Sequence, residues 1–206
     1  TKLLENTFRH VNIALVNELA IFARELEVDV WEAIDAAATK PFGFMKFTPG
    51  PGVGGHCLPV DPSYLSWQVR RSLGHNFRFV ELANEVNAHM PDYVVQRVML
   101  GLNARKKALN GSQVLLLGLS YKKNVGDDRE SPSLRIAELL LTHGAKVVAV
   151  DPFVSECRVE GVSMETLSEE LLRHSDAGIL LTDHDAFDYE MIASSDIYIL
   201  DTKNKL

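Results

Sequence analysis

The sequence has few cysteines, no run of basic residues and no long apolar stretch. Cys57 and Cys157 are its two cysteines in 206 residues, which is too few for a disulfide scaffold and typical of a reducing cytosol. A net charge of −7 without a lysine–arginine run argues against nucleic acid or a membrane surface as a partner. No apolar run approaches the roughly 18 residues that a membrane-spanning helix needs, and no secretory signal is visible. We therefore expect a cytoplasmic location, with no membrane or nucleic-acid partner.

The first half of the chain has a helical pattern. Apolar residues are 46% of the sequence, enough to bury a sizeable core. Asp29 is a candidate N-cap and Pro91 suits the first turn of a helix. We expect helices over residues 2–26, 30–38, 62–72, 79–87 and 91–109. The first of these is too apolar for a one-sided surface helix, so we expect it to be buried on most sides, in a homodimer formed through an all-helical domain of residues 1–110.

The second half alternates short apolar runs with amphipathic segments. We expect strands over residues 114–117, 146–150, 177–181 and 196–200, with helices over 133–143, 165–174 and 187–192. This alternation predicts an α/β fold, a Rossmann-like parallel sheet over residues 111–206 that binds ligands where the strands end. Gly118, Asp151, Thr182 and Asp201 stand at those ends. No second and third glycine follow Gly118, so the pattern does not support ordinary dinucleotide binding by this domain.

The most informative segment is GPGVGGHCLPVDP at positions 50–62. Its glycines allow a close approach of the backbone to a ligand. Cys57 precedes an expected helix, whose dipole favours the reactive thiolate over a thiol with a pKa of about 8.5. Asp61 follows four positions later. The segment ends an irregular stretch, residues 40–57, whose length is typical of a functional loop. A catalytic nucleophile is the reading we favour, and a buried structural cysteine is the alternative.

Two groups of polar residues could complete such a site. Lys2, Asn6 and Arg9 share one face of the first expected helix. They either pair with chain that precedes Thr1 or stabilise an oxyanion. In the loop 121–132, Lys122, Lys123 and Arg129 follow the first strand, where they could bind a phosphorylated ligand. The alternative is a solvated loop whose acidic residues neutralise these cations. Ser131-Pro132 is a helix-start signal.

Other chemistries fit the residues less well. A thiol hydrolase needs a histidine facing the sulfur, and His56 is only a sequence neighbour of Cys57. These two residues lack the spaced partners of a zinc site, so we expect no metal. The remaining histidines are scattered, and we expect them at the surface or at helix ends. They are His10, His75, His89, His143, His174 and His184.

Three motifs together resemble the UDP-glucose/GDP-mannose dehydrogenase family of nucleotide-sugar 6-dehydrogenases. They are KLLENTFR at 2–9 with NIALVNE at 12–18, then GGHCLPVDP at 54–62, and GLSYKK at 118–123 with RESP at 129–132. The resemblance covers the family's central and C-terminal domains. It implies oxidation of the C6 alcohol of a UDP-sugar to a carboxylate, with two NAD and one water, and a homodimer. The family's N-terminal NAD-binding domain is not in this chain, which does not begin with Met, so we expect a piece of a longer protein that is inactive alone.

The resemblance also implies a role for individual residues. Cys57 would capture the C6 aldehyde as a thiohemiacetal that becomes a thioester. Lys2 and Asn6 would hold the oxyanion and the catalytic water, and Asp61 would place or deprotonate that water. The remaining assignments are Phe47, Gly50, Gly52, Gly54, Tyr121 and Lys122 for the substrate, and Gly54, Arg129 and Lys203 for the cofactor.

Some positions depart from the family pattern. Val60 stands where many relatives have lysine, and Lys203 where arginine is common. Residues 39–44 and His56 are more similar to the branch acting on UDP-N-acetylhexosamines than to the UDP-glucose branch. Two further readings stay open, a β-hydroxyacid-type dehydrogenase, which has no use for Cys57, and a non-catalytic module for dimerisation and nucleotide binding.

Overall fold

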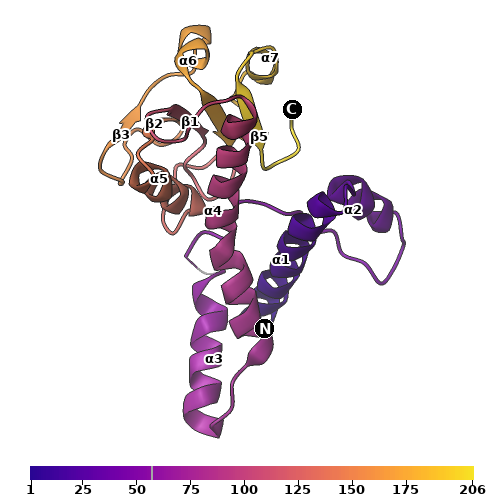
Figure 1. The fold of residues 1–206 in the computed structure, drawn as a ribbon. Coiled ribbons are helices and arrows are strands. Elements are labelled where there is room, and N and C mark those ends of the chain that lie inside the picture. Colours follow the sequence, from indigo (N-terminus) through magenta and orange to yellow (C-terminus); the bar gives the residue numbers. More distant parts are fainter. Residues whose placement is uncertain (57) are drawn as a thin grey trace. The chain divides into compact units, whose positions relative to one another are not determined.

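The computed structural model describes residues 1–56 and 58–206 (Figure 1). By internal packing the chain divides into two compact units, Thr1–Met90 and Pro91–Leu206. The division falls inside helix α4 (Arg78–Ala104). The expected domain boundary after residue 110 lies beyond the end of this helix and stays a prediction.

The first unit contains helices α1 (Lys2–Glu25), α2 (Val30–Ala38), α3 (Val60–Leu73) and the first part of α4. Asp29 is the N-cap of α2, as predicted, since its carboxylate accepts hydrogen bonds from two backbone N–H groups of the first turn. Residues 40–56 form neither helix nor strand. No helix in the described ranges combines the length and apolarity that crossing a membrane requires.

Helix α4 corrects one expectation. We expected a helix to end near residue 87 and another to start at Pro91, but α4 runs through this proline and stops at Ala104, short of residue 109. Proline inside a helix removes one backbone hydrogen bond. Met90, Pro91 and Val94 are all buried, and their packing outweighs that loss.

Helix α1 is buried on its polar side. Asn6, His10 and Asn17 are buried, whereas large apolar side chains remain exposed. The exposed set comprises Leu4, Phe8, Leu15, Leu19, Phe22 and Leu26, which we call the α1 stripe. Its spacing of three, four and seven residues places it along one helix face. This chain therefore leaves one face of α1 exposed, and the expected burial of that face in a homodimer stays a prediction.

The second unit is a five-stranded parallel sheet in the order β3-β2-β1-β4-β5. Its strands are β1 (Gln113–Leu117), β2 (Lys146–Val150), β3 (Val162–Met164), β4 (Ala177–Leu180) and β5 (Tyr198–Asp201). The helices are α5 (Pro132–Thr142), α6 (Glu169–His174) and α7 (Tyr189–Ala193). The predicted α/β fold is confirmed. The sequence did not predict β3, a three-residue edge strand, and the helix expected from residue 165 begins at Glu169.

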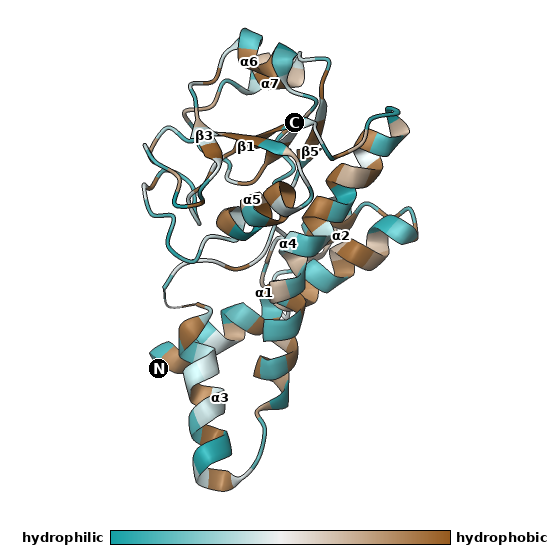
Figure 2. Ribbon diagram, turned by 60° about the vertical axis from the view of Figure 1, so that its left-hand side comes forward, coloured by the Kyte–Doolittle hydropathy of each residue, from teal (hydrophilic) through white to brown (hydrophobic). Residues whose placement is uncertain are grey.

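Helices cover both faces of this sheet. Val114 and Leu116 of β1 belong to the core cluster that includes residues of α4 and α5. Leu115 and Leu117 point to the opposite face and pack with residues of α6 and α7. Figure 2 shows the strands in hydrophobic colours. The three inner strands, β2, β1 and β4, are therefore buried on both sides, as expected of a parallel sheet between helices.

Candidate functional site

The second unit places two loops at the switch point of its sheet. Strands β1 and β4 are neighbours, and the strand order proceeds from them in opposite directions. Gly118 follows β1 with φ +94°, and a Cβ there would lie 2.5 Å from the Cβ of Thr182. Only glycine allows this approach. The loops after β1 and β4 thus meet where such sheets bind ligands.

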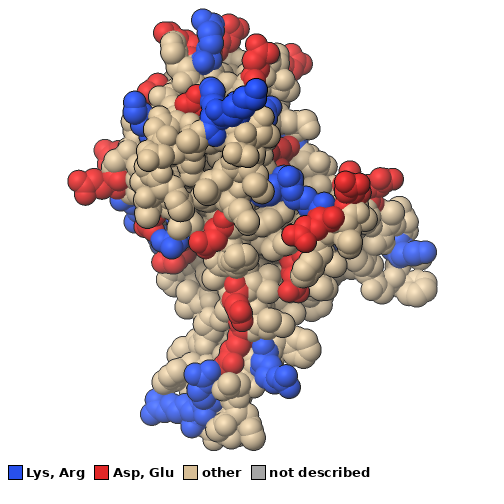
Figure 3. All heavy atoms as spheres, viewed as in Figure 1, with Lys and Arg blue, Asp and Glu red and all other residues tan. Residues whose placement is uncertain are grey.

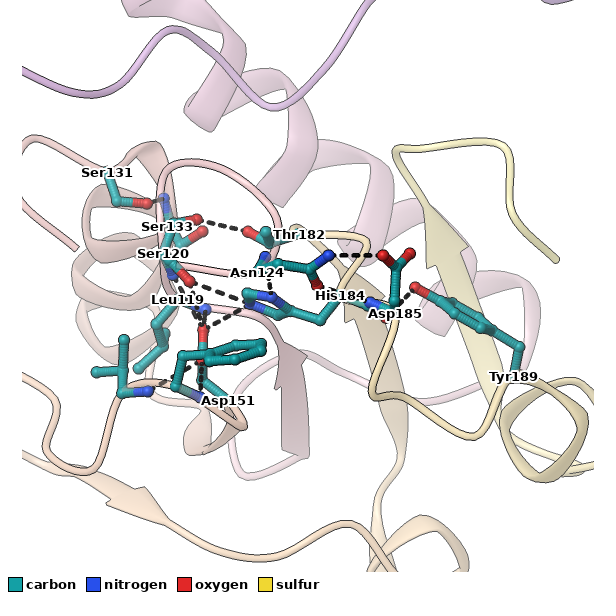
Figure 4. Close-up of polar contacts among 12 residues, drawn as sticks. Leu119, Ser120, Asn124, Ser131, Ser133, Asp151, Thr182, His184, Asp185 and Tyr189 are labelled. Carbon is teal, nitrogen blue, oxygen red and sulfur yellow. Dashed lines mark hydrogen bonds and ion pairs between the residues drawn. The ribbon is translucent and has the colours of Figure 1, made fainter. Parts of the chain in front are cut away.

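A buried hydrogen-bond cluster fastens this point (Figure 4). Asp151 Oδ2 accepts hydrogen bonds from the backbone N–H of Leu119 at 2.7 Å and from the Ser120 hydroxyl at 2.9 Å. It also contacts His184 Nε2 at 3.0 Å. Its other oxygen, Oδ1, accepts from the N–H groups of Phe153 and Val154. The Asp151 carboxylate therefore joins the segments that follow β1, β2 and β4.

The hydrogen bonds decide the charge of Asp151. Burial of its carboxylate acts to raise the pKa, but hydrogen bonds from His184 and from backbone N–H groups outweigh burial and hold the pKa far below its usual range. In a Rossmann dinucleotide site, an acidic residue near this position binds the ribose. Here both carboxylate oxygens of Asp151 are occupied by hydrogen bonds within the protein. The residues at this edge consequently do not fit an ordinary NAD site, in agreement with the missing glycines.

Ser120, His184 and Asp151 do not form a catalytic triad. The backbone N–H of Asn124 donates to His184 Nδ1 at 2.9 Å, so the neutral ring carries its proton on Nε2. That nitrogen faces both Asp151 and the Ser120 hydroxyl, which lies 3.1 Å away. It has no free lone pair to take the serine proton, and Ser120 and His184 are buried. The arrangement lacks the base that such a triad requires.

The three cations of the loop after β1 have different surroundings. Tyr121 N–H donates to the Asp127 carbonyl at 3.0 Å and closes the loop of residues 121–127. Lys123 pairs with Asp185 at 3.1 Å. Arg129 binds both oxygens of Asp127 through its guanidinium, and its hydrogen bonds lower the pKa of Asp127 to about 2.

Lys122 differs from these neighbours. It is exposed, and its side chain makes no hydrogen bond or ion pair within residues 1–56 and 58–206. On the face seen in Figure 3, Lys and Arg alternate with Asp and Glu, so the affinity of an anion must come from a local group. The alternative of a loop neutralised by its own acidic residues holds for Arg129, which pairs with Asp127, whereas Lys123 pairs with Asp185 outside the loop. The alternative does not hold for Lys122.

Lys203 follows β5 in a different setting. Burial lowers its pKa, and the nearby Asp183 and Asp201 carboxylates oppose this effect. Asp201 itself accepts hydrogen bonds from backbone N–H groups of the chain end, including that of Lys203 at 2.7 Å. Lys203 is therefore half-buried, with two carboxylates near its ammonium.

The first unit brings Lys2 and Asn6 of α1 onto Asp61 of α3. Asp61 Oδ2 accepts a hydrogen bond from Asn6 Nδ2 at 2.7 Å and lies 3.0 Å from Lys2 Nζ. Arg9 donates to the other end of the Asn6 amide. Hydrogen bonds from Lys2 and then from Asn6 lower the pKa of Asp61. The polar line predicted on the first helix thus converges on the predicted carboxylate.

The glycine-rich loop adjoins the same helix. Phe47 contacts Phe8 with ring centroids 5.8 Å apart, and the Gly50 N–H donates to the buried Asn17 side chain at 2.9 Å. Gly52 has φ +134°, and Gly54 is half-buried. The predicted nucleophile, Cys57, lies outside the described residues.

Comparison with family models assigns both halves of the chain to one family. Residues 1–89 match the UDP-glucose/GDP-mannose dehydrogenase family, central domain, and residues 115–206 match the UDP binding domain of that family. The chain belongs to the UDP-glucose/GDP-mannose dehydrogenase family. The resemblance inferred from the three motifs is confirmed.

Individual relatives agree with this assignment. The UDP-N-acetyl-D-mannosamine dehydrogenase of Methanococcus maripaludis is 40% identical over all of this chain and 47% of its own length. A solved UDP-D-ManNAc dehydrogenase from Pyrococcus horikoshii is 34% identical with a TM-score of 0.83, covering 98% of this chain and 47% of that one. A UDP-glucose dehydrogenase from Pyrobaculum islandicum is 29% identical with a TM-score of 0.82, covering 98% and 46%. The chain thus spans about half the length of these dehydrogenases.

Two histidines of this family member were misjudged from the sequence. We expected His10 and His184 at the surface or at helix ends, but both are buried. His10 Nε2 lies 2.7 Å from Asn84 Oδ1, and Asn17 donates to Asn87 at 2.9 Å. These residues form a polar network between α1 and α4. The position of His184 just after a buried strand was the signal that could have identified it.

Metal ions require particular sets of ligands in a protein. In residues 1–56 and 58–206 there is no group of His, Cys, Asp and Glu side chains that could hold a metal ion. Cys157 is free and half-buried, and burial raises the pKa of its thiol. It is therefore a poor candidate for a nucleophile.

Proposed function

We propose that this chain is the nucleophile-bearing, UDP-sugar-binding half of an NAD-dependent nucleotide-sugar 6-dehydrogenase. The observation that carries the proposal is the convergence of Lys2 and Asn6 on Asp61, a carboxylate four positions after Cys57. A cation, an amide and a carboxylate, with a cysteine four positions before the carboxylate in the sequence, suit the oxidation of an alcohol through an enzyme-bound thioester.

Each group has a separate task in this reaction. Cys57 Sγ adds to the C6 aldehyde to form a thiohemiacetal, and loss of a hydride and a proton from that adduct leaves a thioester. Lys2 and Asn6 stabilise the oxyanion. Water then adds to the thioester carbon, and cleavage of the C–S bond frees the carboxylate and the Cys57 thiol. Because Lys2 and Asn6 lower the pKa of Asp61, this carboxylate is a weak base and is better suited to place the water than to deprotonate it.

NAD, when bound, would supply the oxidant twice, by accepting a hydride from C6 of the alcohol to give the aldehyde and again from C6 of the thiohemiacetal to give the thioester. The sheet of the second unit does not fit an ordinary dinucleotide site, so most contacts to NAD would come from the N-terminal half found in relatives. Arg129, Lys203 and Gly54 remain the proposed cofactor contacts of this chain. Arg129 would have to loosen its pairing with Asp127, and the half-buried Lys203 would have to become more exposed. Accordingly, we expect no NADH production by this chain alone from any UDP-sugar.

Substrate recognition is proposed for the switch point of the sheet and the glycine-rich loop. Lys122 would bind the diphosphate, with Tyr121 beside it, because Lys122 is exposed and its ammonium makes no hydrogen bond or ion pair with the described part of the chain. Phe47, Gly50, Gly52 and Gly54 would contact the uridine and the sugar. The names of the relatives favour a UDP-N-acetylhexosamine such as UDP-N-acetyl-D-mannosamine over UDP-glucose.

The α1 stripe is the proposed surface for homodimerisation. It presents large apolar side chains along one face of a single helix, an exposure that is unusual in a monomer. Pairing with a second copy would cover it. A cytoplasmic location is consistent with the low cysteine content.

Thiol labelling of this chain tests the assignment of the nucleophile. We expect iodoacetamide to alkylate Cys57 faster than Cys157 at neutral pH, because a thiolate reacts and burial raises the pKa of Cys157. A saturating UDP-sugar should slow the labelling of Cys57. Cys157→Ser isolates the first thiol and Cys57→Ser the second. Faster alkylation of Cys157 than of Cys57, or a rate of Cys57 alkylation that the UDP-sugar does not change, would contradict the proposal.

A further inference from the structure

Asn124 occupies a constrained position at the tip of the loop of residues 121–127. Its φ is +59°, a left-handed conformation that asparagine tolerates better than most residues. Its side-chain oxygen accepts the Asp185 N–H at 3.0 Å, and its side-chain nitrogen donates to Asp185 Oδ2 at 2.6 Å. Its own N–H donates to His184 Nδ1. Three hydrogen bonds thus fix the loop tip to two consecutive residues after β4 (Figure 4).

His184 is itself held rigidly. Its ring contacts Phe153 and Phe187, with centroids 5.0 and 5.4 Å away, and Nε2 is fixed by Asp151 at 3.0 Å. The Tyr189 hydroxyl donates to its backbone carbonyl at 2.8 Å. The ring therefore presents Nδ1 as a fixed acceptor at the base of an exposed loop.

The position of Lys122 depends on these contacts. Lys122 lies between Tyr121, whose N–H closes the loop onto Asp127, and the tethered Asn124. Since the Lys122 side chain makes no polar contact of its own in the described chain, only the backbone can hold it in place. A loop fixed before binding pays less conformational entropy when it takes up an anion.

We propose that His184 is a positioning residue of the nucleotide site: by accepting the Asn124 N–H through Nδ1, it holds the loop in the shape that presents Lys122 to the diphosphate. The inference rests on the proposed function that the chain binds UDP. His184 does not touch the ligand, and its effect passes through Asn124 to Lys122.

Two substitutions of His184 separate this role from simple packing. Asparagine places a side-chain oxygen near the position of Nδ1, so His184→Asn keeps the acceptor for Asn124 and loses the donor to Asp151. Glutamine reaches the position of Nε2, so His184→Gln keeps the donor and loses the acceptor. Both substitutions remove the ring and should lower the melting temperature. Only His184→Gln should detach the loop.

Calorimetric titration of this chain with UDP gives the readout. We expect His184→Gln to weaken UDP binding about three- to tenfold, the effect of one lost hydrogen bond, and His184→Asn to stay within about twofold of the parent. Asp185→Asn, which removes the charge facing Lys123 but retains an oxygen for Asn124, should bind no more weakly than the parent. Equal losses in His184→Asn and His184→Gln, or unchanged binding by His184→Gln, would overturn the inference. A parent chain that does not bind UDP would instead refute the proposed function.

Hydrogen exchange in the parent gives a second test that needs no variant. The Asn124 amide should exchange slowly for a loop residue, and UDP should slow it further, because opening the loop must break its bond to His184. Fast exchange that UDP does not alter would also overturn the proposal.

Discussion

The buried positions of strand β1 in the second unit are all apolar, whereas helix α1 in the first unit also buries polar side chains. In β1 the residues from Val114 to Leu117 are fully buried and apolar. In α1 the buried positions include Asn6, His10 and Asn17, while Phe22 and Leu19 are about half exposed. The sheet unit is therefore stabilised by its own core. The helical unit uses its inner side for a polar network and leaves its apolar side for another surface.

The difference also separates two kinds of site. In the first unit, the buried Asn17 accepts a hydrogen bond from the Gly50 N–H of the glycine-rich loop. The side chains of Lys2 and Asn6 contact the carboxylate of Asp61. In the second unit, buried polar groups hydrogen-bond to the backbone, and the exposed Lys122 has no polar partner among the described residues. We infer that chemistry belongs to the first region and anion binding to the second.

Charges placed on the α1 stripe should have the largest effect. We expect Leu15→Asp combined with Leu19→Asp to turn a dimer into a monomer, because two carboxylates would have to be buried at the interface without partners. Multi-angle light scattering at micromolar concentration measures the mass. Arg24→Asp, on the same helix but outside the stripe, is the matched control and should remain dimeric. A monomeric parent, or a dimeric double variant, would contradict the dimer proposal.

Truncation of one leucine in each region should sharpen the contrast. Leu116→Ala removes a fully buried side chain and should lower the unfolding free energy of the sheet unit by about 2–5 kcal/mol. Leu19→Ala should change that quantity by less than about 0.5 kcal/mol, since the side chain is outside the sheet core. Hydrogen exchange of the β1 amides measures both. Equal losses of unfolding free energy in Leu116→Ala and Leu19→Ala would refute the conclusion that the sheet unit has a core of its own.

Acid should weaken the two regions in different pH windows. Burial lowers the pKa of His10, against the effect of its hydrogen bond to Asn84, so the unfolded chain binds a proton first and stability is lost as pH falls below about 6.5. The lowered pKa of Asp151 has the same sign at lower pH. Its contribution is present above the unfolded value of about 3.9 and is lost as pH falls below it.

Two variants test these windows. Both tryptophans, Trp31 and Trp67, lie in the first unit, so their fluorescence reports unfolding there, while β1 amide exchange reports on the sheet. His10→Gln should flatten the pH dependence of the fluorescence signal near pH 6, and Asp151→Asn that of the sheet below pH of about 4. An unchanged pH profile in either variant would show that the substituted residue does not cause the loss of stability in acid.

Periodicity predicted most of the fold because the strands of the sheet are continuous apolar runs and the helices carry ordinary caps such as Asp29 and Ser131. It could not predict that α4 passes through Pro91, since tertiary packing decided this. The strand Val162–Met164 was too short to give a pattern.

The site was predicted unevenly. Lys2, Asn6 and Asp61 were identified from the sequence, because residue spacing alone shows which residues share a helix face and which belong to a motif. In the structure their side chains do converge. The cluster of Asp151, Ser120 and His184 was missed, although Asp151 had been placed at a strand end. Its members come from the ends of three strands, and only the strand order reveals that they meet.

The central claim, that the loop after β1 offers one cation to UDP, is tested most directly by titrating this chain with UDP in two neighbouring variants. Lys122→Ala should weaken binding roughly ten- to a hundredfold, the effect of a lost charge-assisted hydrogen bond. Lys123→Ala, which removes a cation already paired with Asp185, should stay within about twofold. The affinity of the parent should fall as salt rises. Wild-type affinity in Lys122→Ala, or an equal loss in Lys123→Ala, would contradict the account.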